Sequence, residues 1–239
     1  MTLHALIMQP RPTLTARSAA RTHVGRVRQV NEDRLLDAPE IGLWAVADGM
    51  GGHVGGGAAA TEAIRALCGL AEPVTLDAIE FSLAKAHEAV RGAGDERGTT
   101  IAGLTIAEGR FTAFWIGDSR VYRLREGLLE QITRDHSLVQ ELVNSGVLTP
   151  DQAARHPHAN IITRAIGIES WTAPDTISGD ALSGDCFLIC SDGLSGLVET
   201  ADIARMLGRA PAAAVDALIA AALDAGGTDN VTAVVIAID

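Results

Sequence analysis

Features that define several other protein classes are absent or scarce in this sequence of 239 residues. Three cysteines, Cys68, Cys186 and Cys190, cannot form an even disulfide framework, so we expect them to be reduced and mostly buried. No apolar run approaches the roughly 18 residues that a membrane-spanning helix needs, so no membrane partner is expected. Basic residues number 19 against 30 acidic ones, and the net charge of −11 argues against a nucleic-acid partner.

The amino-terminal segment lacks the apolar core of a secretory signal. Five arginines and no acidic residue precede Glu32, a composition that faintly resembles an organelle transit peptide. We prefer a simpler interpretation, in which residues 1–13 are a flexible tail. Residues 14–239, with 47% apolar residues in the whole chain, then form a single domain. We expect a cytoplasmic monomer.

Short apolar runs rich in β-branched or aromatic residues predict strands, and runs with apolar residues at three- and four-residue spacing predict helices. The strands are expected near 14–19, 42–47, 99–107, 110–117, 120–124, 128–132, 186–190 and 230–238. The helices are expected near 58–70, 75–91, 149–155, 200–208 and 211–224. Short turn sequences between neighbouring strands predict antiparallel hairpins. The order of elements therefore predicts an α/β domain, of the α+β type, with mainly antiparallel sheets.

Carboxylates stand at the ends of several predicted strands. The segments are "NED" (31–33), "ADG" (47–49), "GDS" (117–119), "SDG" (191–193) and "GTDN" (227–230). Each segment alone is typical of a turn. Together they predict several carboxylates at one point, which requires a cation because uncompensated like charges are unstable. Oxygen ligands without cysteine or histidine favour Mg²⁺, Mn²⁺ or Ca²⁺.

Six glycines lie within nine residues in "VADGMGGHVGGG" (46–57). A P-loop is excluded because no Lys-Ser or Lys-Thr pair ends the stretch. "GGGAAA" (55–60) matches a loose dinucleotide-binding pattern, which would make the protein an oxidoreductase. The carboxylate of Asp48 would repel a pyrophosphate, and a meander of strands follows, so this alternative is disfavoured.

Eight segments in order make the chain resemble the bacterial form of the metal-dependent Ser/Thr protein phosphatases, the protein phosphatase 2C type. They are "GRVRQVNED", "WAVADGMGGHVGGG", "GTTIAGL", "WIGDSRVYRL", "ITRDHSLVQELVNSGVLT", "HPHANIITRAIG", "LICSDGLSG" and "GGTDNVTAVVI". The resemblance implies a four-layer α-β-β-α sandwich of two antiparallel sheets flanked by helices. It implies a phosphatase domain over residues 14–239, with a flap at about 135–168 that contributes to substrate choice.

The resemblance also implies a set of metal-binding residues: Glu32, Asp33, Asp48, Gly49, Asp118, Asp192 and Asp229. Two core Mn²⁺ or Mg²⁺ ions are implied, bridged by Asp48, and a third ion at Asp118 and Asp192. Either Glu32 or Asp33 is the direct ligand of the first acidic motif. Arg28 is implied as a phosphate clamp, and Asn230 as a residue that orients the site.

Hydrolysis of a phosphomonoester fits these residues. Two cations can hold a bridging water or hydroxide that attacks phosphorus directly, while Arg28 binds phosphoryl oxygens. The catalytic candidates are thus Arg28, Asp48 and His53. His53 is either a general acid or a loop residue that touches substrate. His136, His156 and His158 fall in the flap, where a loop or hinge role is favoured over metal binding.

The expected function is a Ser/Thr phosphoprotein phosphatase that acts on phosphoserine and phosphothreonine proteins and opposes a bacterial Ser/Thr kinase. A binding module on the same fold is the alternative, which loss of ligands would indicate. Asp48, Asp118, Asp192 and Asp229 are all present, so the enzyme is favoured.

Overall fold

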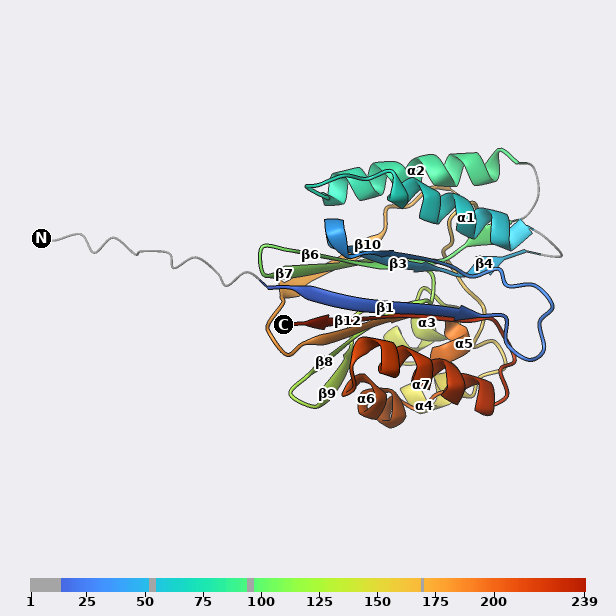
Figure 1. Ribbon diagram of the computed structural model, residues 1–239. Coiled ribbons are helices and arrows are strands. Elements are labelled where there is room, and N and C mark those ends of the chain that lie inside the picture. The colour runs from blue at the N-terminus through green and yellow to red at the C-terminus, as the bar shows by residue number, and fades with distance from the viewer. Residues whose placement is uncertain (1–13, 52–54, 94–96, 169) are drawn as a thin grey trace, which may run out of the picture.

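The fold is a sandwich of two antiparallel sheets between layers of helices, as the computed structural model shows (Figure 1). The structure describes residues 14–51, 55–93, 97–168 and 170–239, so the predicted tail at 1–13 lies outside the described residues. One five-stranded sheet has the order β10 (Asp175–Asp180), β7 (Arg110–Ile116), β6 (Ile101–Ala107), β3 (Leu43–Ala47) and β2 (Arg34–Ala38). The other has the order β1 (Ala16–His23), β12 (Val231–Ile238), β11 (Cys186–Cys190), β8 (Arg120–Arg125) and β9 (Leu128–Gln131). A two-stranded ribbon joins β4 (Gly49–Met50) to β5 (Gly98–Thr99).

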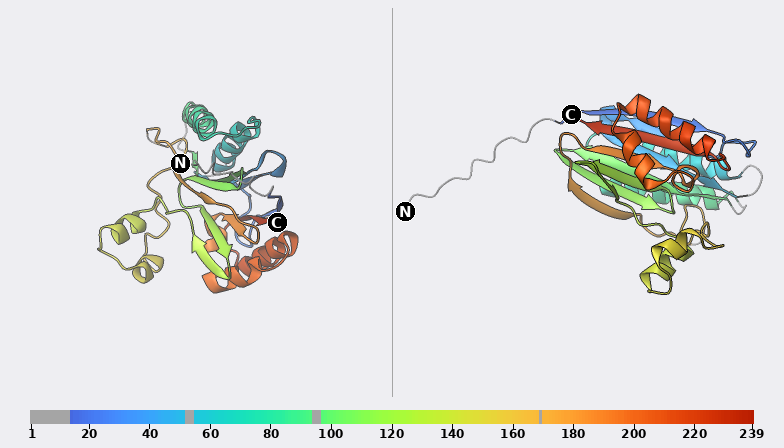
Figure 2. Two further views of the ribbon diagram at one scale, coloured as in Figure 1. Left: turned by 90° about the vertical axis from the view of Figure 1, so that its left-hand side faces the viewer. Right: turned by 90° about the horizontal axis from the view of Figure 1, so that it is seen from below.

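Helices cover both outer faces of the sandwich (Figures 1 and 2). The helices α1 (Gly55–Cys68) and α2 (Leu76–Arg91) lie over the sheet that contains β3, and a short 3-10 helix, η1 (Pro39–Ile41), precedes that strand. The helices α5 (Asp192–Ser195), α6 (Thr200–Leu207) and α7 (Pro211–Asp224) lie over the other sheet. Two further helices, α3 (Leu138–Asn144) and α4 (Pro150–Ala154), project from the side of the sandwich (Figure 2).

Continuous apolar strands form because both faces of each sheet are covered. In β3, Leu43 and Ala45 pack under the helices α1 and α2, whereas Trp44 and Val46 point between the two sheets. This alternation follows from the two-residue period of a strand. The result is a middle core between the sheets and one core under each helix layer, and Trp44 is fully buried in the middle core.

The predicted hairpins are present and have two-residue turns. Glu108 and Gly109 connect β6 to β7, and both have positive φ angles, 51° and 72°. Glu126 and Gly127 connect β8 to β9 with φ angles of 51° and 81°. Two successive positive φ angles match the twist of the flanking strands, which is why such turns favour hairpins.

Helix starts follow the capping residues of the sequence. Thr75 accepts a hydrogen bond from the amide of Ala78 and begins α2 as predicted. Thr149 and Gln152 form a reciprocal capping box at the start of α4. Helix α1 begins at Gly55, three residues earlier than the predicted start at 58. Cys186 and Cys190 are buried as expected, whereas Cys68 is exposed at the end of α1.

Three strands lie outside the ranges predicted from periodicity. The strands β2 and β10 are the edges of their sheet, and β10 has the polar sequence DTISGD with an exposed face. Edge strands bury one face poorly, so their apolar pattern is weak. The ribbon strand β4 contains two residues, too few for any period to be visible. Within the described ranges, no helix is both long and apolar enough to cross a membrane.

Candidate active site

Five aspartates meet at one end of the sandwich, the right-hand end in Figure 1. Strand pairing explains this. Arg34 pairs with Ala47, which places Asp33 and Asp48 side by side at the shared end of β2 and β3. Cys190 pairs with Ala233, which brings the end of β11 beside the start of β12. The aspartates that form this cluster each lie within two residues of a strand: Asp33, Asp48, Asp118, Asp192 and Asp229.

Hydroxyl groups join the two sheets beneath these carboxylates. Ser191 Oγ donates to Asp33 Oδ2 at 2.8 Å and accepts from the amide of Thr232 at 3.0 Å. Thr100 Oγ1 and Ser119 Oγ lie 2.7 Å apart, and both side chains are buried. These contacts cross from one sheet to the other, so they fix the separation of the strands that carry the aspartates.

The backbone of Asp48 is held on both sides by a pair of threonines. Its amide donates to Thr100 Oγ1 at 3.0 Å. Its carbonyl accepts from Thr99 Oγ1 at 2.9 Å and from the Thr100 amide at 2.9 Å. In the sequence, both threonines belong to the motif "GTTIAGL". Two adjacent hydroxyls at the start of an apolar strand were the signal available for them.

The neighbouring carboxylates strongly disfavour one another's charged forms. Burial, followed by the charges of Asp33 and Asp192, raises the pKa of Asp48 well above its usual range. Burial and the charge of Asp229 also raise the pKa of Asp192. Burial raises the pKa of Asp33 to about 6, although Thr232 and Ser191 donate hydrogen bonds to it. Such mutual repulsion is relieved when a cation lies between the groups.

Asp118 is the second observation that points to a cation. Its side chain is 8% exposed, and its Oδ1 has no hydrogen-bond partner among the described residues. Burial and the charges of Asp192 and Asp135 raise its pKa to about 7. A buried carboxylate oxygen without a donor is costly, and a hard cation would satisfy it.

The structure distinguishes the position of the Glu32 side chain from that of Asp33, a choice that the sequence leaves open. Glu32 Oε1 accepts from the amide of Gly57, in the first turn of α1, at 3.1 Å. Asp33 is 2% exposed and lies within the carboxylate group. Of the two, Asp33 therefore has the side chain that joins the aspartate cluster.

Arg28 and Asn230 complete the end of the sandwich. Arg28 Nη2 donates to Asp229 Oδ2 at 2.7 Å, and its side chain is more than half exposed. Asn230 Oδ1 accepts from the Glu32 amide, while its Nδ2 donates to the carbonyls of Val24 and Val30. Asn230 thus ties the loop that carries Arg28 and Glu32 to the start of β12.

Gly49 permits a close approach of two backbones. A Cβ at Gly49 would lie 2.3 Å from the carbonyl carbon and oxygen of Gly56, and a Cβ at Gly56 would lie 2.5 Å from the carbonyl carbon of Gly49. The start of α1 is therefore pressed against the residue that follows Asp48. The carboxylate of Glu32 occupies the helix end where a pyrophosphate would bind, so the dinucleotide alternative does not fit.

The donor set fits hard divalent cations. Only oxygen ligands are offered, four of the carboxylates have raised pKa values, and one buried oxygen lacks a donor. In the described part of the chain, however, no three acidic, cysteine or histidine side chains already stand in a metal-binding arrangement.

The histidines singled out in the sequence lie in different surroundings. His53 lies outside the described residues. His136 packs against Trp115, accepts from the Gly117 amide at 3.1 Å, and has its Nε2 2.9 Å from Arg164 Nη1. Burial and the charge of Arg164 lower its pKa. His156 and His158 lie beside each other in the loop after α4, with ring centroids 5.5 Å apart.

A partly buried ion pair that the sequence analysis does not predict supports the same end of the fold. Arg120 binds both carboxylate oxygens of Asp135 and also donates to the hydroxyl of Tyr122. The charge of Arg120 partly offsets the raised pKa of Asp118. The motif "GDSRVYRL" contains Arg120, but only the fold shows that its partner is 15 residues away.

A family model described as protein phosphatase 2C matches residues 21–225. The chain belongs to the protein phosphatase 2C family. It is 40% identical over 241 residues to the serine/threonine protein phosphatase PstP of Mycobacterium tuberculosis, covering 94% of this chain and 45% of that protein. The chain thus spans about half the length of this curated relative.

Solved structures agree with this assignment. A structure described as PppA, a key regulatory component of T6SS in Pseudomonas aeruginosa, has a TM-score of 0.87 and 39% identity, covering 94% of this chain and 98% of that one. The catalytic domain of PstP in complex with two manganese ions has a TM-score of 0.86 and 36% identity, covering 95% and 99%. The predicted family and sandwich fold are confirmed.

Proposed function

We propose that this protein is a metal-dependent phosphatase of phosphoserine and phosphothreonine proteins. One observation carries the proposal: Asp33, Asp48, Asp118 and Asp192 gather at one end of the sandwich with raised pKa values. Two comparisons with one relative support it, since PstP is named a Ser/Thr protein phosphatase and a structure of its catalytic domain is in complex with two manganese ions. The same ligands are proposed here for Mn²⁺ or Mg²⁺.

The position of each residue suggests its role in metal binding or in phosphate binding. Asp33, Asp48, Asp118, Asp192 and Asp229 would hold the cations, with the carbonyl of Gly49 as a further ligand. When bound, divalent cations activate water and neutralise phosphoryl oxygens. Arg28 remains accessible beside Asp229, so its guanidinium would bind two phosphate oxygens through its fork. Glu32 instead positions this segment by capping α1.

The remaining roles extend the proposal to the substrate. His53 would act as the general acid for the leaving alkoxide or touch the substrate, as the sequence indicates. The segment at about 135–168, which includes α3 and α4, would act as a flap that selects the phosphoprotein. A cognate Ser/Thr kinase, a cytoplasmic location and a monomeric state belong to the same proposal.

Phosphate release from a phosphothreonine peptide tests the function. We expect release with Mn²⁺ or Mg²⁺, loss of release with EDTA, and loss in Asp192→Asn. The matched control is Asp216→Asn, which changes an exposed aspartate on α7 and keeps full activity. No release from folded, metal-loaded protein across several phosphopeptides would overturn the proposal and favour a binding module.

A further inference from the structure

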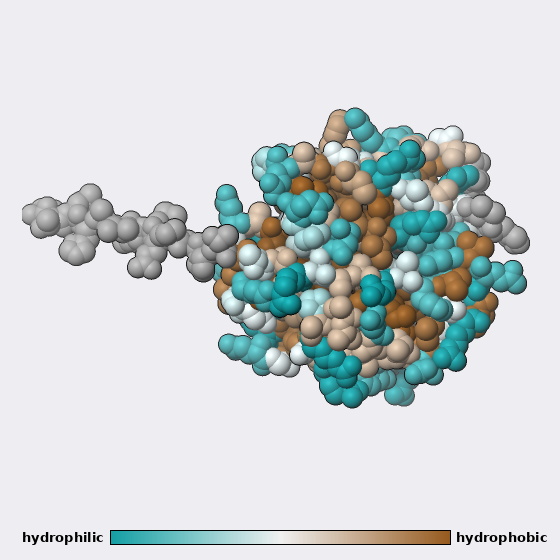
Figure 3. All heavy atoms as spheres, in the orientation of Figure 1, coloured by the Kyte–Doolittle hydropathy of each residue, from teal (hydrophilic) through white to brown (hydrophobic). Residues whose placement is uncertain are grey.

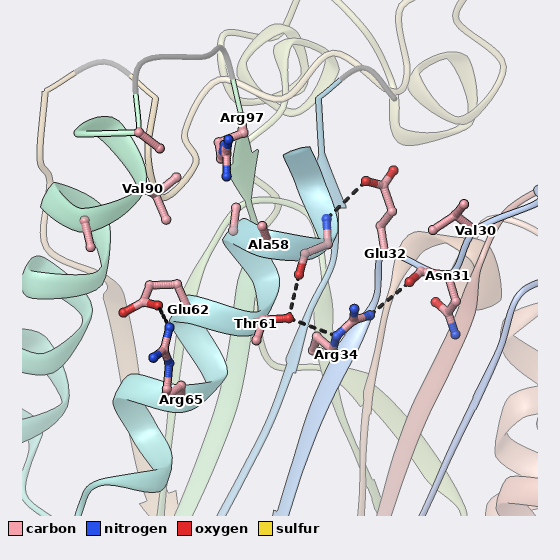
Figure 4. A pocket seen from close by; sticks show the side chains of 14 residues that line it. Val30, Asn31, Glu32, Arg34, Ala58, Thr61, Glu62, Arg65, Val90 and Arg97 are labelled. Atoms are coloured by element: carbon pink, nitrogen blue, oxygen red, sulfur yellow. Dashed lines mark hydrogen bonds and ion pairs between the residues drawn. The ribbon is translucent and has the colours of Figure 1, made fainter. Parts of the chain in front are cut away.

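A cavity of about 450 Å³ opens next to the aspartate cluster (Figure 4). It lies between α1, α2 and the segment 30–34 that leads into β2. Glu32 forms one wall, and the next residue, Asp33, belongs to the cluster. The volume falls within the usual range of ligand pockets. The mechanism proposed above does not use this cavity.

The charged groups that line the lower part of the cavity are already bonded to the protein. Arg34 donates to Thr61 Oγ1 at 3.0 Å and to the carbonyls of Asn31 and Asp33 at 2.9 Å and 2.7 Å. Arg65 forms an ion pair with Glu62 (Figure 4). These arginines support the walls, so they do not by themselves indicate an anionic ligand.

Apart from Arg97 at the upper rim (Figure 4), the rest of the lining is made mostly of small apolar side chains and glycine. Val30 lies on one side, Ala58 on α1, and three residues of the carboxyl-terminal part of α2 and the turn after it lie opposite: Ala89, Val90 and Ala93. Val30 is 59% exposed, a large fraction for a valine. Figure 3 shows apolar patches that interrupt the hydrophilic surface at this end of the molecule. Val90 is buried, but Val30, Ala58, Ala89 and Ala93 are exposed, so the cavity offers apolar surface that nothing in the described chain covers.

The position of Val30 connects the cavity with the phosphate. Val30 is two residues from Arg28, so their Cα atoms are at most about 7.6 Å apart. An extended peptide advances about 3.3 Å per residue. A substrate whose phosphate binds Arg28 therefore brings a residue within about three positions of the phosphorylated one to the mouth of the cavity. Val27, on the other side of Arg28, is also 65% exposed.

We propose that this cavity receives an aliphatic or aromatic side chain of the phosphoprotein substrate, within three residues of the phosphorylated serine or threonine. The proposal rests on the proposed function and adds a substrate preference to it. A second phosphate would meet Arg97, but it fits less well than an apolar side chain, because Glu32 and Glu62 carry negative charge into the same lining and Arg34 and Arg65 are bonded within the protein.

The experiment compares phosphothreonine peptides that carry alanine, leucine, phenylalanine, aspartate or a second phosphothreonine at each of the three positions on either side. For the wild-type protein we expect kcat/KM to be at least about tenfold higher for leucine or phenylalanine than for alanine at one position. Ala89→Trp fills the cavity from the exposed face of α2 and should bring this ratio close to one. Val30→Ser removes apolar wall without filling space and should lower the ratio severalfold.

The matched control is Ala220→Trp, which places the same side chain at an exposed alanine in the middle of α7 and keeps the wild-type ratio. A ratio near one at every position in the wild type, or a preference that survives in both Ala89→Trp and Val30→Ser, would overturn the inference. So would a preference for the second phosphothreonine alone. Mn²⁺-dependent hydrolysis of p-nitrophenyl phosphate by the wild type reports the proposed function separately, because this small ester has no flanking residue.

Discussion

The charge of Asp118 should destabilise the metal-free protein, and Asp118→Asn tests this. The carboxyl is 8% exposed, and its pKa is raised to about 7 from an ordinary value of 3.8. Between these two pH values the unfolded chain has lost a proton that the folded chain retains. The free energy of unfolding of the metal-free protein therefore falls as pH rises through this window. At about 1.4 kcal/mol per pKa unit, the loss is at most about 4 kcal/mol.

The asparagine variant removes this pH-dependent penalty. At pH 5 only about 1.6 kcal/mol of this penalty has developed, and the buried amide of the variant has a polar cost of similar size, so the two proteins should have similar stability. At pH 8, in EDTA, we expect Asp118→Asn to be more stable by about 1–3 kcal/mol, because the amide has a buried polar cost of its own. Urea denaturation at the two pH values measures the difference. Asp216→Asn, an exposed site, should change stability by less than about 0.5 kcal/mol at both.

Addition of Mn²⁺ at pH 8 should make the wild-type protein more stable than Asp118→Asn. A ligand at 100 times its Kd stabilises the folded state by about 2.7 kcal/mol, and the variant should bind the cation at its site more weakly. Equal destabilisation by Asp118→Asn at pH 5 and pH 8 would refute the reasoning, because it would show that the carboxylate is satisfied within the protein.

Three further predictions concern the residues around the cluster. Asn230→Ala removes three hydrogen bonds to the loop 24–32 and should lower the free energy of unfolding, measured by urea denaturation, by about 2–4 kcal/mol. The control Asn144→Ala, at an exposed position of α3, should lower it by less than about 0.5 kcal/mol. Gly193→Ala places a Cβ 1.9 Å from the carbonyl oxygen of Asn230, so calorimetry should show a lower melting temperature and weaker Mn²⁺ binding. Arg28→Ala should lower kcat/KM for a phosphopeptide at least about tenfold, with unchanged Mn²⁺ binding by titration. Unchanged kcat/KM would remove Arg28 from the phosphate site.

Positions near strand ends were predictable because they depend on local chemistry. An aspartate beside glycine or serine after an apolar run marks both the end of a strand and a turn. Asp48 and Asp192 were located in this way, and the pairing of β3 with β2 and of β11 with β12 brings such ends together. The edge strand β10 was not predictable, because its polar face removes the alternation.

The choice between adjacent residues required tertiary contacts. Glu32 and Asp33 are consecutive, and consecutive side chains near a strand point to opposite sides. Which side faces the cluster depends on Ser191 and Gly57, which are distant in sequence. The cavity beside Glu32 likewise needs the packing of α1 against α2, for which no local pattern exists.

The glycine-rich segment after Asp48 allows α1 to pack closely against the end of β3. The backbones of Gly49 and Gly56 approach so closely that a Cβ on either would overlap the other. Helix α1 therefore starts directly against the carboxylate end of β3, and its first turn binds the side chain of Glu32. Glu32 is followed by Asp33 and lies two residues after Val30. One close backbone contact therefore positions both the aspartate cluster and the apolar cavity. Changes at Gly49 or Gly56 should consequently affect metal binding and peptide selectivity together, whereas Ala89→Trp affects selectivity alone.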